Sequence, residues 1–237
     1  MSVYSISNQK IDPSRRRPTQ LKPDGSPDDN DRVEIGPTAL AFREWEEAGL
    51  TAPNLDRMRQ FRLERLMAEL GRHDYAGILC FDPLNIRYAT DTTNMQLWTS
   101  HNLARACFIS ADGYVVLWDF HNCGHLSAHL PIVREVRHGA SFFYFESGDR
   151  VDEHAAKFAA EIDDLMRLHG GSNRRLAVDK IETAGYEALR KLGVEIHEGQ
   201  EVTEIARVVK GPDEILAMRC AMLSCEKAVG EMHAVLE

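Results

Sequence analysis

A helical pattern of apolar residues follows Pro212 and constrains the fold of this chain more than any other feature. Proline is tolerated in the first turn of a helix, and Asp213 and Glu214 favour the positive end of the helix dipole. The apolar residues that follow recur every three or four positions: Ile215, Met218, Met222, Cys225, Val229, Met232 and Leu236. This apolar stripe predicts an amphipathic helix that needs a partner surface, because a row of exposed large apolar groups is an aggregation liability.

No other segment of the sequence is an obvious cover for this apolar stripe. We therefore interpret the chain as a complete first domain followed by the first helix of a second domain that is missing. Three parts are predicted: an extended polar arm over residues 1–35, a domain over 36–205, and a linker with the first helix of the truncated domain over 206–237. The arm is expected to be ordered only where it drapes over other structure, and a free tail is the alternative.

The composition excludes several classes of protein. The 237 residues carry a formal net charge of −9 and have a pI of about 5.6, which argues against a binder of nucleic acid or anionic membranes. No stretch approaches the roughly 20 apolar residues of a membrane span, and we predict a cytoplasmic protein. The five cysteines form no Cys-x-x-Cys pair, so a disulfide framework is not expected. Cys80 and Cys107 lie in apolar runs and are predicted to be small buried hydrophobes.

Alternation of apolar runs and helical patterns predicts an α/β domain with a mixed sheet flanked by helices. One helix is expected to begin at Asp56 as its N-cap and to end near Arg72. Asp112-Gly113 supplies the turn of a hairpin. The other helices are expected over 38–48, 123–129, 152–169 and 183–192, and the strands over 75–81, 104–110, 114–118, 133–137, 176–178 and 195–196.

Three histidines, His121, His125 and His129, are spaced so that a helix would bring them to one face. Such a face can chelate a transition metal. Against this, Gly124 weakens the helix and no carboxylate stands at ligand spacing within the segment. The alternative is a solvent-facing helix with incidental histidines. Known nucleophile, phosphate-binding and His-Glu-x-x-His motifs are absent, so no active site is recognised from the residues alone.

The expected loop over 82–102 is chemically unusual, because it follows a buried strand and ends in polar and aromatic side chains. Tyr88 is one of its apolar anchors, and Met95, Trp98 and His101 lie toward its tip. One interpretation is that Tyr88 and Trp98 pack in the core. The other is that Trp98 projects into a neighbouring pocket, where its face holds a sulfonium or quaternary ammonium group by cation–π attraction.

Two motifs, DPLNIRY over 82–88 and RVVKGPDEI over 207–215, resemble those of the amino-terminal domain of creatinase/prolidase-type "pita-bread" proteins. Within that group the chain looks most like the dimethylsulfoniopropionate lyases of the DddP type from marine bacteria. The stretches that carry this closer resemblance are KIDPS over 10–14, NDRVEIGP over 30–37, IRYATDTTNMQLW over 86–98 and VKGPDEILAMRCA over 209–221. The resemblance spans nearly the whole chain.

The resemblance implies a homodimeric, metal-dependent carbon–sulfur lyase that splits dimethylsulfoniopropionate into dimethyl sulfide and acrylate. An Asp base would remove the proton alpha to the carboxylate while a metal centre polarises that carboxylate. The metal, a divalent or trivalent ion such as iron or another transition metal, and the catalytic Asp belong to the second domain of the family. This chain is therefore expected to hold no catalytic residue and no metal ligand, and to show no turnover alone.

The resemblance carries one binding residue over to this chain. Trp98 matches the family tryptophan that lines the substrate site, and by resemblance it faces the sulfonium, across the dimer interface. His101 and Asn102 follow it directly and are secondary candidates. The expected partners are a second copy of the chain and a small sulfonium substrate.

Two other functions stay open at this point. The first is a prolidase-like or aminopeptidase branch of the same group, which would act on X-Pro substrates with the same second domain. The second is a non-catalytic interaction domain that dimerises by burying two copies of the apolar stripe together. The MQLW sequence over 95–98 and the KIDPS arm favour the lyase.

Overall fold

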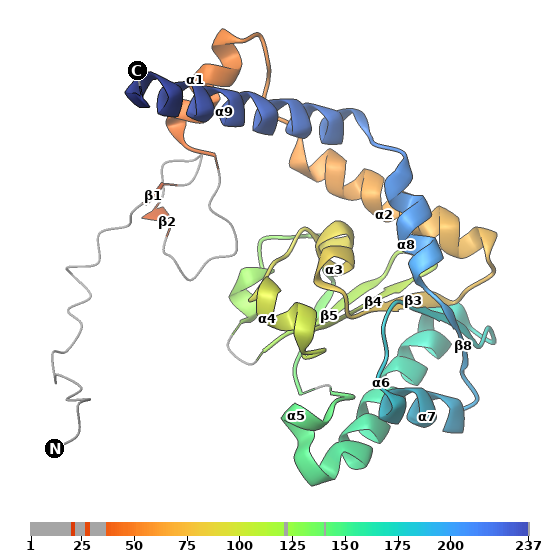
Figure 1. Ribbon diagram of the computed structural model, residues 1–237. Coiled ribbons are helices and arrows are strands. Elements are labelled where there is room, and N and C mark those ends of the chain that lie inside the picture. Colours follow the sequence, from red (N-terminus) through yellow and green to blue (C-terminus); the bar gives the residue numbers. More distant parts are fainter. Residues whose placement is uncertain (1–19, 22–26, 29–36, 121–122, 140, 237) are drawn as a thin grey trace, which may run out of the picture.

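The computed structural model describes residues 20–21, 27–28, 37–120, 123–139 and 141–236. It confirms the predicted α/β class, because a six-stranded mixed sheet carries helices on both of its faces (Figure 1). The strand order is β6-β5-β4-β3-β7-β8, and each predicted strand overlaps one of these. The strands are β3 (Gly77–Cys80), β4 (Ala106–Ser110), β5 (Val115–Trp118), β6 (Glu135–Arg137), β7 (Arg175–Val178) and β8 (Glu195–Glu198).

The predicted hairpin forms the centre of the antiparallel half of the sheet. β4 and β5 pair antiparallel with Ala106 opposite Trp118, and Gly113 takes the left-handed backbone of the turn with a φ of 88°. β3 pairs antiparallel with β4 and parallel with β7, so it joins the hairpin to the parallel strands. Every residue of β3, β4 and β5 is buried, as expected for strands with helices on both faces.

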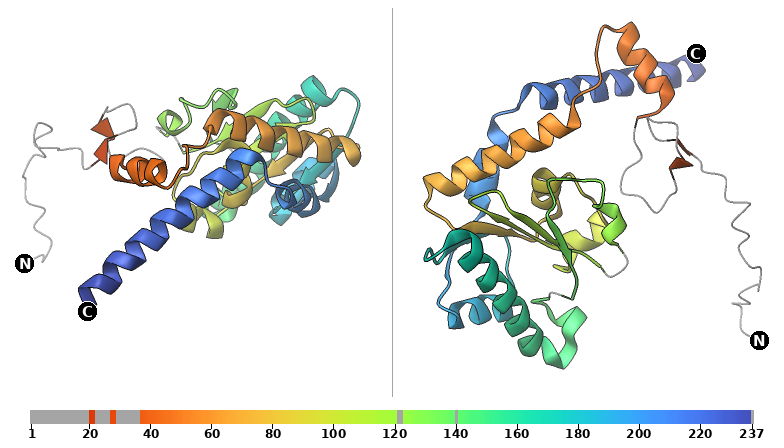
Figure 2. Two further views of the ribbon diagram at one scale, coloured as in Figure 1. Left: turned by 90° about the horizontal axis from the view of Figure 1, so that it is seen from above. Right: turned by 180° about the vertical axis from the view of Figure 1, so that it is seen from behind.

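Two hydrophobic cores lie on opposite faces of the sheet. Alternate residues of β3 divide between them, because side chains point to opposite faces along a strand: Leu79 joins one core, and Ile78 and Cys80 join the other. Cys80 and Cys107 are both buried in the second core, which confirms the sequence prediction. The first face is covered by α6 (Val151–Gly170) and α7 (Thr183–Lys191), and the second by α2 (Leu55–Arg72), α3 (Pro83–Thr90) and α8 (Gln200–Val208), as Figure 2 shows from behind.

The start of α2 differs from the prediction. Asn54, not Asp56, is the N-cap, because the Asn54 side chain accepts a hydrogen bond from the backbone N–H of Arg57 at 2.9 Å. Asp56 lies in the first turn and pairs with Arg59 at 3.0 Å. The helix therefore begins earlier than the sequence suggested, and it ends at Arg72 as expected.

The predicted linker is also partly helical. Residues 206–208 of it belong to α8, whose Val202 and Ala206 are buried in the core beside α2. Tyr88 of α3 donates a hydrogen bond to the carbonyl of Ala206 at 3.0 Å. The connection between α8 and the next helix is therefore limited to residues 209–211.

The last helix, α9, runs from Pro212 to Leu236, as the periodicity predicts. Its buried residues include Asp213, Glu214 and Cys220, all near its start. α1 (Ala39–Glu47) lies beside it, and the indole Nε1 of Trp45 donates to Ser224 Oγ at 3.1 Å. The remainder of α9 extends away from the sheet (Figures 1 and 2).

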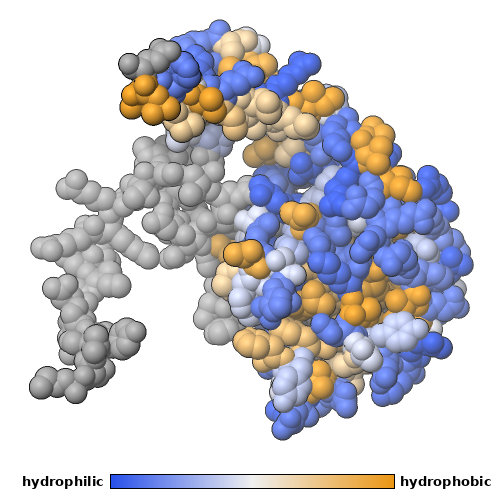
Figure 3. Space-filling model, in the orientation of Figure 1, coloured by the Kyte–Doolittle hydropathy of each residue, from blue (hydrophilic) through white to orange (hydrophobic). Residues whose placement is uncertain are grey.

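The apolar stripe on α9 is uncovered by the described part of the chain. All of its residues from Ile215 to Leu236 are exposed, and Figure 3 shows apolar atoms gathered along this helix and at its end. Most of the predicted polar arm lies outside the described residues. The short strands β1 (Gln20–Leu21) and β2 (Pro27–Asp28) pair antiparallel within it.

Candidate functional site

The segment that was predicted to be a loop after β3 contains two helices. Asp82 caps the first helix, α3, by accepting a hydrogen bond from the backbone N–H of Leu84 at 2.8 Å, and Pro83 occupies the first turn. α3 ends at Thr90 and is capped by Asp91, whose backbone is left-handed. The second helix, α4 (Gln96–His101), begins after Met95, which is also left-handed. The expectation of a loop was wrong, because both helices are too short to give a clear apolar period.

Trp98 lies on α4 and belongs to an aromatic cluster at the edge of the domain. Its ring centroid is 5.7 Å from that of Phe120, which follows β5, and 6.0 Å from that of Phe145 on α5 (Tyr144–Ser147). The ring of Phe145 stacks in turn on that of Phe143, with centroids 6.2 Å apart. Three segments of the sequence therefore meet in this aromatic cluster.

This cluster is separate from the two cores of the sheet. Tyr88 is buried in the core, as one interpretation of the sequence held, but Trp98 is only partly buried and joins neither core. Two residues beside it are exposed to solvent: Leu97 by 88% and Phe145 by 73%. Exposed aromatic faces of this kind can hold a cation through the ring quadrupole.

The two secondary candidates are placed differently from each other. Asn102 directs its side chain back to its own helix, where the amide Nδ2 donates to the carbonyl of Trp98 at 3.2 Å. Its backbone N–H bonds the same carbonyl at 2.9 Å, so Asn102 closes the end of α4. His101 lies at the exposed end of that helix. Phe120 and Phe145 were not identified from the sequence. Their contacts with Trp98 join residues far apart in the chain, and no local sequence pattern predicts such contacts.

The histidine segment does not form the α-helix that was expected over 123–129. The described residues of this segment contain a 3₁₀ turn, Gly124–Leu126, with the N–H of Leu126 bonded to the carbonyl of Cys123 at 3.0 Å. A 3₁₀ turn aligns residues three apart, so it does not present residues four apart on one face. His121 lies outside the described residues. Among the described residues, no three His, Cys, Asp or Glu side chains gather as metal ligands.

A polar hollow of about 190 Å³ lies at the carboxyl ends of β3, β7 and β8. Its charged groups pair with one another: Lys180 contacts Asp82 at 2.7 Å, and Arg207 pairs with Glu204. At its base, buried Asp179 accepts hydrogen bonds from the backbone of Phe81 at 2.7 Å and from the amide of Asn85 at 2.9 Å. Burial raises the pKa of Asp179 above its ordinary value in spite of these hydrogen bonds. These groups satisfy one another's charges and hydrogen bonds. We therefore interpret the residues around this hollow as a structural network.

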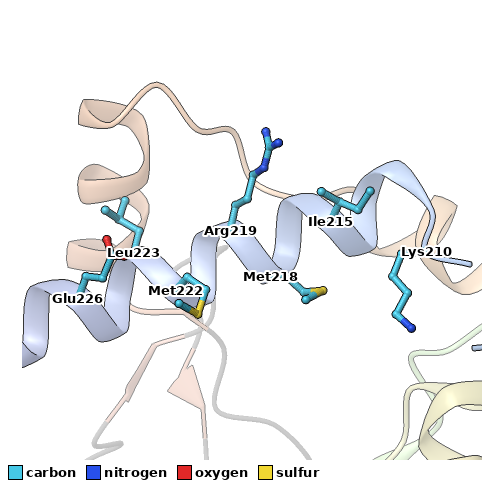
Figure 4. Close-up of a pocket in the computed structure, with 7 residues that line it drawn as sticks. All are labelled: Lys210, Ile215, Met218, Arg219, Met222, Leu223 and Glu226. Carbon is cyan, nitrogen blue, oxygen red and sulfur yellow. The ribbon is translucent and has the colours of Figure 1, made fainter. Parts of the chain in front are cut away.

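A second hollow of about 490 Å³ runs along α9. Its lining combines Ile215, Met218 and Met222 of the apolar stripe with Lys210, Arg219, Leu223 and Glu226 (Figure 4). It offers an apolar surface and no group of catalytic side chains. None of the helices in the described part of the chain has the length and apolar character that crossing a membrane requires.

Comparison with known proteins confirms the resemblance drawn from the sequence. The chain is 54% identical over 233 residues to the dimethylsulfoniopropionate lyase DddP of Roseovarius nubinhibens, and 56% identical over 233 residues to that of Roseobacter denitrificans. Each match covers 98% of this chain and 52% of the relative. The chain is therefore a relative of these proteins over nearly its whole length, and it spans about half of theirs.

Solved structures give a weaker likeness. The prolidase from Pyrococcus horikoshii is 16% identical, with a TM-score of 0.47, over 74% of this chain and 42% of that one. The Xaa-Pro dipeptidase from Bacillus anthracis is also 16% identical, with a TM-score of 0.47, over 66% of this chain and 38% of that one. No protein-family model matches the chain. At these scores the likeness does not bear on activity.

Proposed function

We propose that this chain is part of a dimethylsulfoniopropionate lyase, in which it shapes the substrate pocket and takes part in dimerisation. Identity of 54–56% over 98% of the chain to two lyases of this name supports the proposal. The reaction would split dimethylsulfoniopropionate into dimethyl sulfide and acrylate in the cytoplasm, by the proton abstraction that the family resemblance implies.

The observation that carries the proposal is the position of Trp98. A tryptophan that serves only the core would be enclosed, as Trp118 is, whereas Trp98 is partly buried at the domain edge, beside the exposed ring of Phe145. An indole face at such an edge suits a sulfonium, because the positive sulfur is attracted to the ring quadrupole and its methyl groups are apolar. We infer that the pocket is completed by a second copy of the protein, which would bring the remaining substrate contacts to this edge.

The metal that the resemblance implies is assigned to no residue described here. These residues bring no three potential ligands together, so they do not fit a metal centre. The proposed part of this chain in the reaction is binding and enclosure of the sulfonium end of the substrate. Proton transfer and activation of the carboxylate would be carried out by the part of the enzyme that corresponds to the unmatched half of the relatives.

The proposal can be tested by fusing this chain to the region of the Roseovarius nubinhibens relative that lies beyond the match. We expect the fusion to release dimethyl sulfide and the chain alone to release none. Trp98→Ala in the fusion should raise KM for dimethylsulfoniopropionate by roughly tenfold, the size of a cation–π contact of about 1–2 kcal/mol. Trp98→Phe should retain part of the affinity.

Leu97→Ala is the matched control, since Leu97 is a neighbour on α4 with an 88% exposed side chain. This variant should leave KM within about twofold of the parent. If Trp98→Ala lowers only the melting temperature and leaves KM unchanged, Trp98 is a packing residue. If the fusion cleaves X-Pro dipeptides and not dimethylsulfoniopropionate, the prolidase-like alternative replaces the lyase.

A further inference from the structure

A buried ion pair lies behind the segment that leads to Trp98. Arg105 and Asp119 flank β4 and β5 at one end of the hairpin, where they continue the ladder beyond the pair Ala106 and Trp118. Arg105 Nε lies 2.9 Å from Asp119 Oδ2, and the two side chains are 1% and 0% exposed. An ion pair this deeply buried loses much of its attraction to desolvation, so its retention calls for a reason beyond stability.

Both members of the pair bind the connection between α3 and α4. The Arg105 guanidinium donates to the hydroxyl of Thr92 through Nη2, and its Nη1 lies 3.4 Å from the carbonyl of Thr92. Asp119 Oδ1 accepts a hydrogen bond from Asn94 Nδ2 at 2.7 Å. The backbone just before α4 is thus held at two points from the end of the hairpin.

The same carboxylate also holds the aromatic neighbour of Trp98. Asp119 Oδ1 accepts the backbone N–H of Phe120 at 2.9 Å, and the ring of Phe120 is 5.7 Å from that of Trp98. A single oxygen therefore fixes Asn94, which precedes the helix of Trp98, and Phe120, against which the indole lies. Moving either group relative to the other would change the tilt of 58° between the two rings.

The backbone on each side of this anchor is in an uncommon conformation. Asp91 has a φ of 62° and Met95 a φ of 41°, and left-handed backbone is unfavourable for residues with a side chain. Such residues persist where surrounding contacts determine the local structure. Arg59 of α2 supplies one of these contacts through its 2.8 Å pair with Asp91, and Asn94 supplies the other beside Met95.

We propose that Arg105, Asp119 and Asn94 are positioning residues that set the orientation of the Trp98 indole at the substrate pocket. They act on the start of α4 and on Phe120, and they touch no substrate themselves. This inference depends on the proposed function only where it predicts a change in KM. Its structural content, that the indole is oriented by these three side chains, stands on the contacts above.

The first test is a spectroscopic measurement on the 237-residue chain labelled with 5-fluorotryptophan. The chain has three tryptophans, so it gives three ¹⁹F resonances, each assigned by a Trp→Phe variant. Asn94→Ala removes one anchor while leaving the buried ion pair in place. We expect it to shift or broaden the Trp98 resonance and to leave those of Trp45 and Trp118 unchanged. Asn173→Ala, which removes the hydrogen bonds of a partly buried asparagine to Asp74 and to the backbone N–H of Arg175, is the matched control and should move none of the three.

The second test measures KM and kcat of the fusion that carries Asn94→Ala. We expect KM to rise at least threefold with kcat little changed, and Asn94→Gln to recover part of the loss. An unaltered Trp98 resonance in Asn94→Ala, with only a lower melting temperature, would show that the network is structural and would overturn the inference.

The failure of the proposed function gives a different result. In that case Trp98→Ala itself leaves KM unchanged, while the ¹⁹F shift in Asn94→Ala still establishes the positioning of the indole. A Trp98 resonance that does not move disproves positioning whatever the kinetics of Trp98→Ala.

Discussion

The guanidinium of Arg57 binds both carboxylate oxygens of Asp213, with Nε 2.5 Å from Oδ2 and Nη2 2.7 Å from Oδ1. This contact ties the first turn of α9 to the first turn of α2. A second ion pair forms at the next residue of α9, where Glu214 Oε1 lies 2.8 Å from Nε of Arg62 on α2. Because Asp213 and Glu214 are successive residues of α9, the two ion pairs fix both the position of this helix and its rotation about its own axis. The apolar stripe is consequently presented in one direction.

The contact between Arg57 and Asp213 predicts an acid-sensitive attachment of α9. The Arg57 side chain, followed by the backbone N–H of Asn54, lowers the pKa of Asp213 below its ordinary value of 3.8. A carboxyl group with a lowered pKa contributes stability above its ordinary pKa, and this contribution is lost as the pH falls through the lower, folded-state value. The melting temperature of Asp213→Asn should therefore lie below that of the wild type at pH 6, and the two should converge toward pH 2.

Asp164→Asn provides the acidic control for this comparison, because Asp164 is exposed on α6. Its melting temperature should follow that of the wild type at every pH. A difference between Asp213→Asn and the wild type that stays constant from pH 6 to pH 2 would contradict the assigned role of the Asp213 charge.

Two helical glycines should respond in opposite ways to alanine. A Cβ on Gly185 of α7 would overlap the ring of Phe142, which is itself buried. Gly185→Ala is therefore expected to destabilise the fold by about 1–3 kcal/mol through overpacking. Gly230 of α9 has no atom within 4 Å of the added Cβ, so Gly230→Ala should stabilise its helix by up to about 1 kcal/mol. Urea unfolding measures both; a gain in stability for Gly185→Ala would disprove the close packing of α7 on Phe142.

The exposed stripe predicts that the chain alone associates with itself. Met222 is 59% exposed in the middle of the stripe, and replacing it with lysine should lower the concentration-dependent mass measured by sedimentation. Leu168→Lys is the control, because Leu168 is also apolar and exposed but lies on α6, outside the stripe. Equal behaviour of the two variants would show that α9 does not drive association.

The succession of strands and long helices along the sequence was predictable because apolar periodicity is a local signal. The long helix α6 and the helix after Pro212 were both recovered within two residues of their observed ends. The capping signal at Asp82-Pro83 was also present in the sequence, although residues 82–102 were interpreted as a loop. α8 was missed because its short apolar pattern runs directly into the Lys210-Gly211-Pro212 connection.

The candidate site was predictable only in part. Trp98 was found through its local sequence, which is the stretch that carries the family resemblance. Its surroundings depend on contacts from α5 and from the residue Phe120 that follows β5, and on a buried pair whose members flank two strands. The left-handed backbone of Met95 has no sequence signal, since glycine or asparagine would be the usual indication. The environment of Trp98 and the backbone of Met95 are thus determined by tertiary contacts, which short-range sequence patterns do not predict.

The buried hydroxyl of Tyr88 predicts a change of stability at alkaline pH. Burial, reinforced by the nearby Glu214 carboxylate, raises its pKa to about 12, and the hydroxyl donates to Ala206 at 3.0 Å. Tyr88→Phe should cost about 1 kcal/mol at pH 7 through the lost hydrogen bond. Above pH 10 the unfolded wild type releases the phenolic proton while the folded chain retains it, so the free energy of unfolding of the wild type falls relative to the variant. Urea unfolding at pH 7, 9 and 11 should show the difference narrowing; a constant difference would mean that Tyr88 ionises alike in both states.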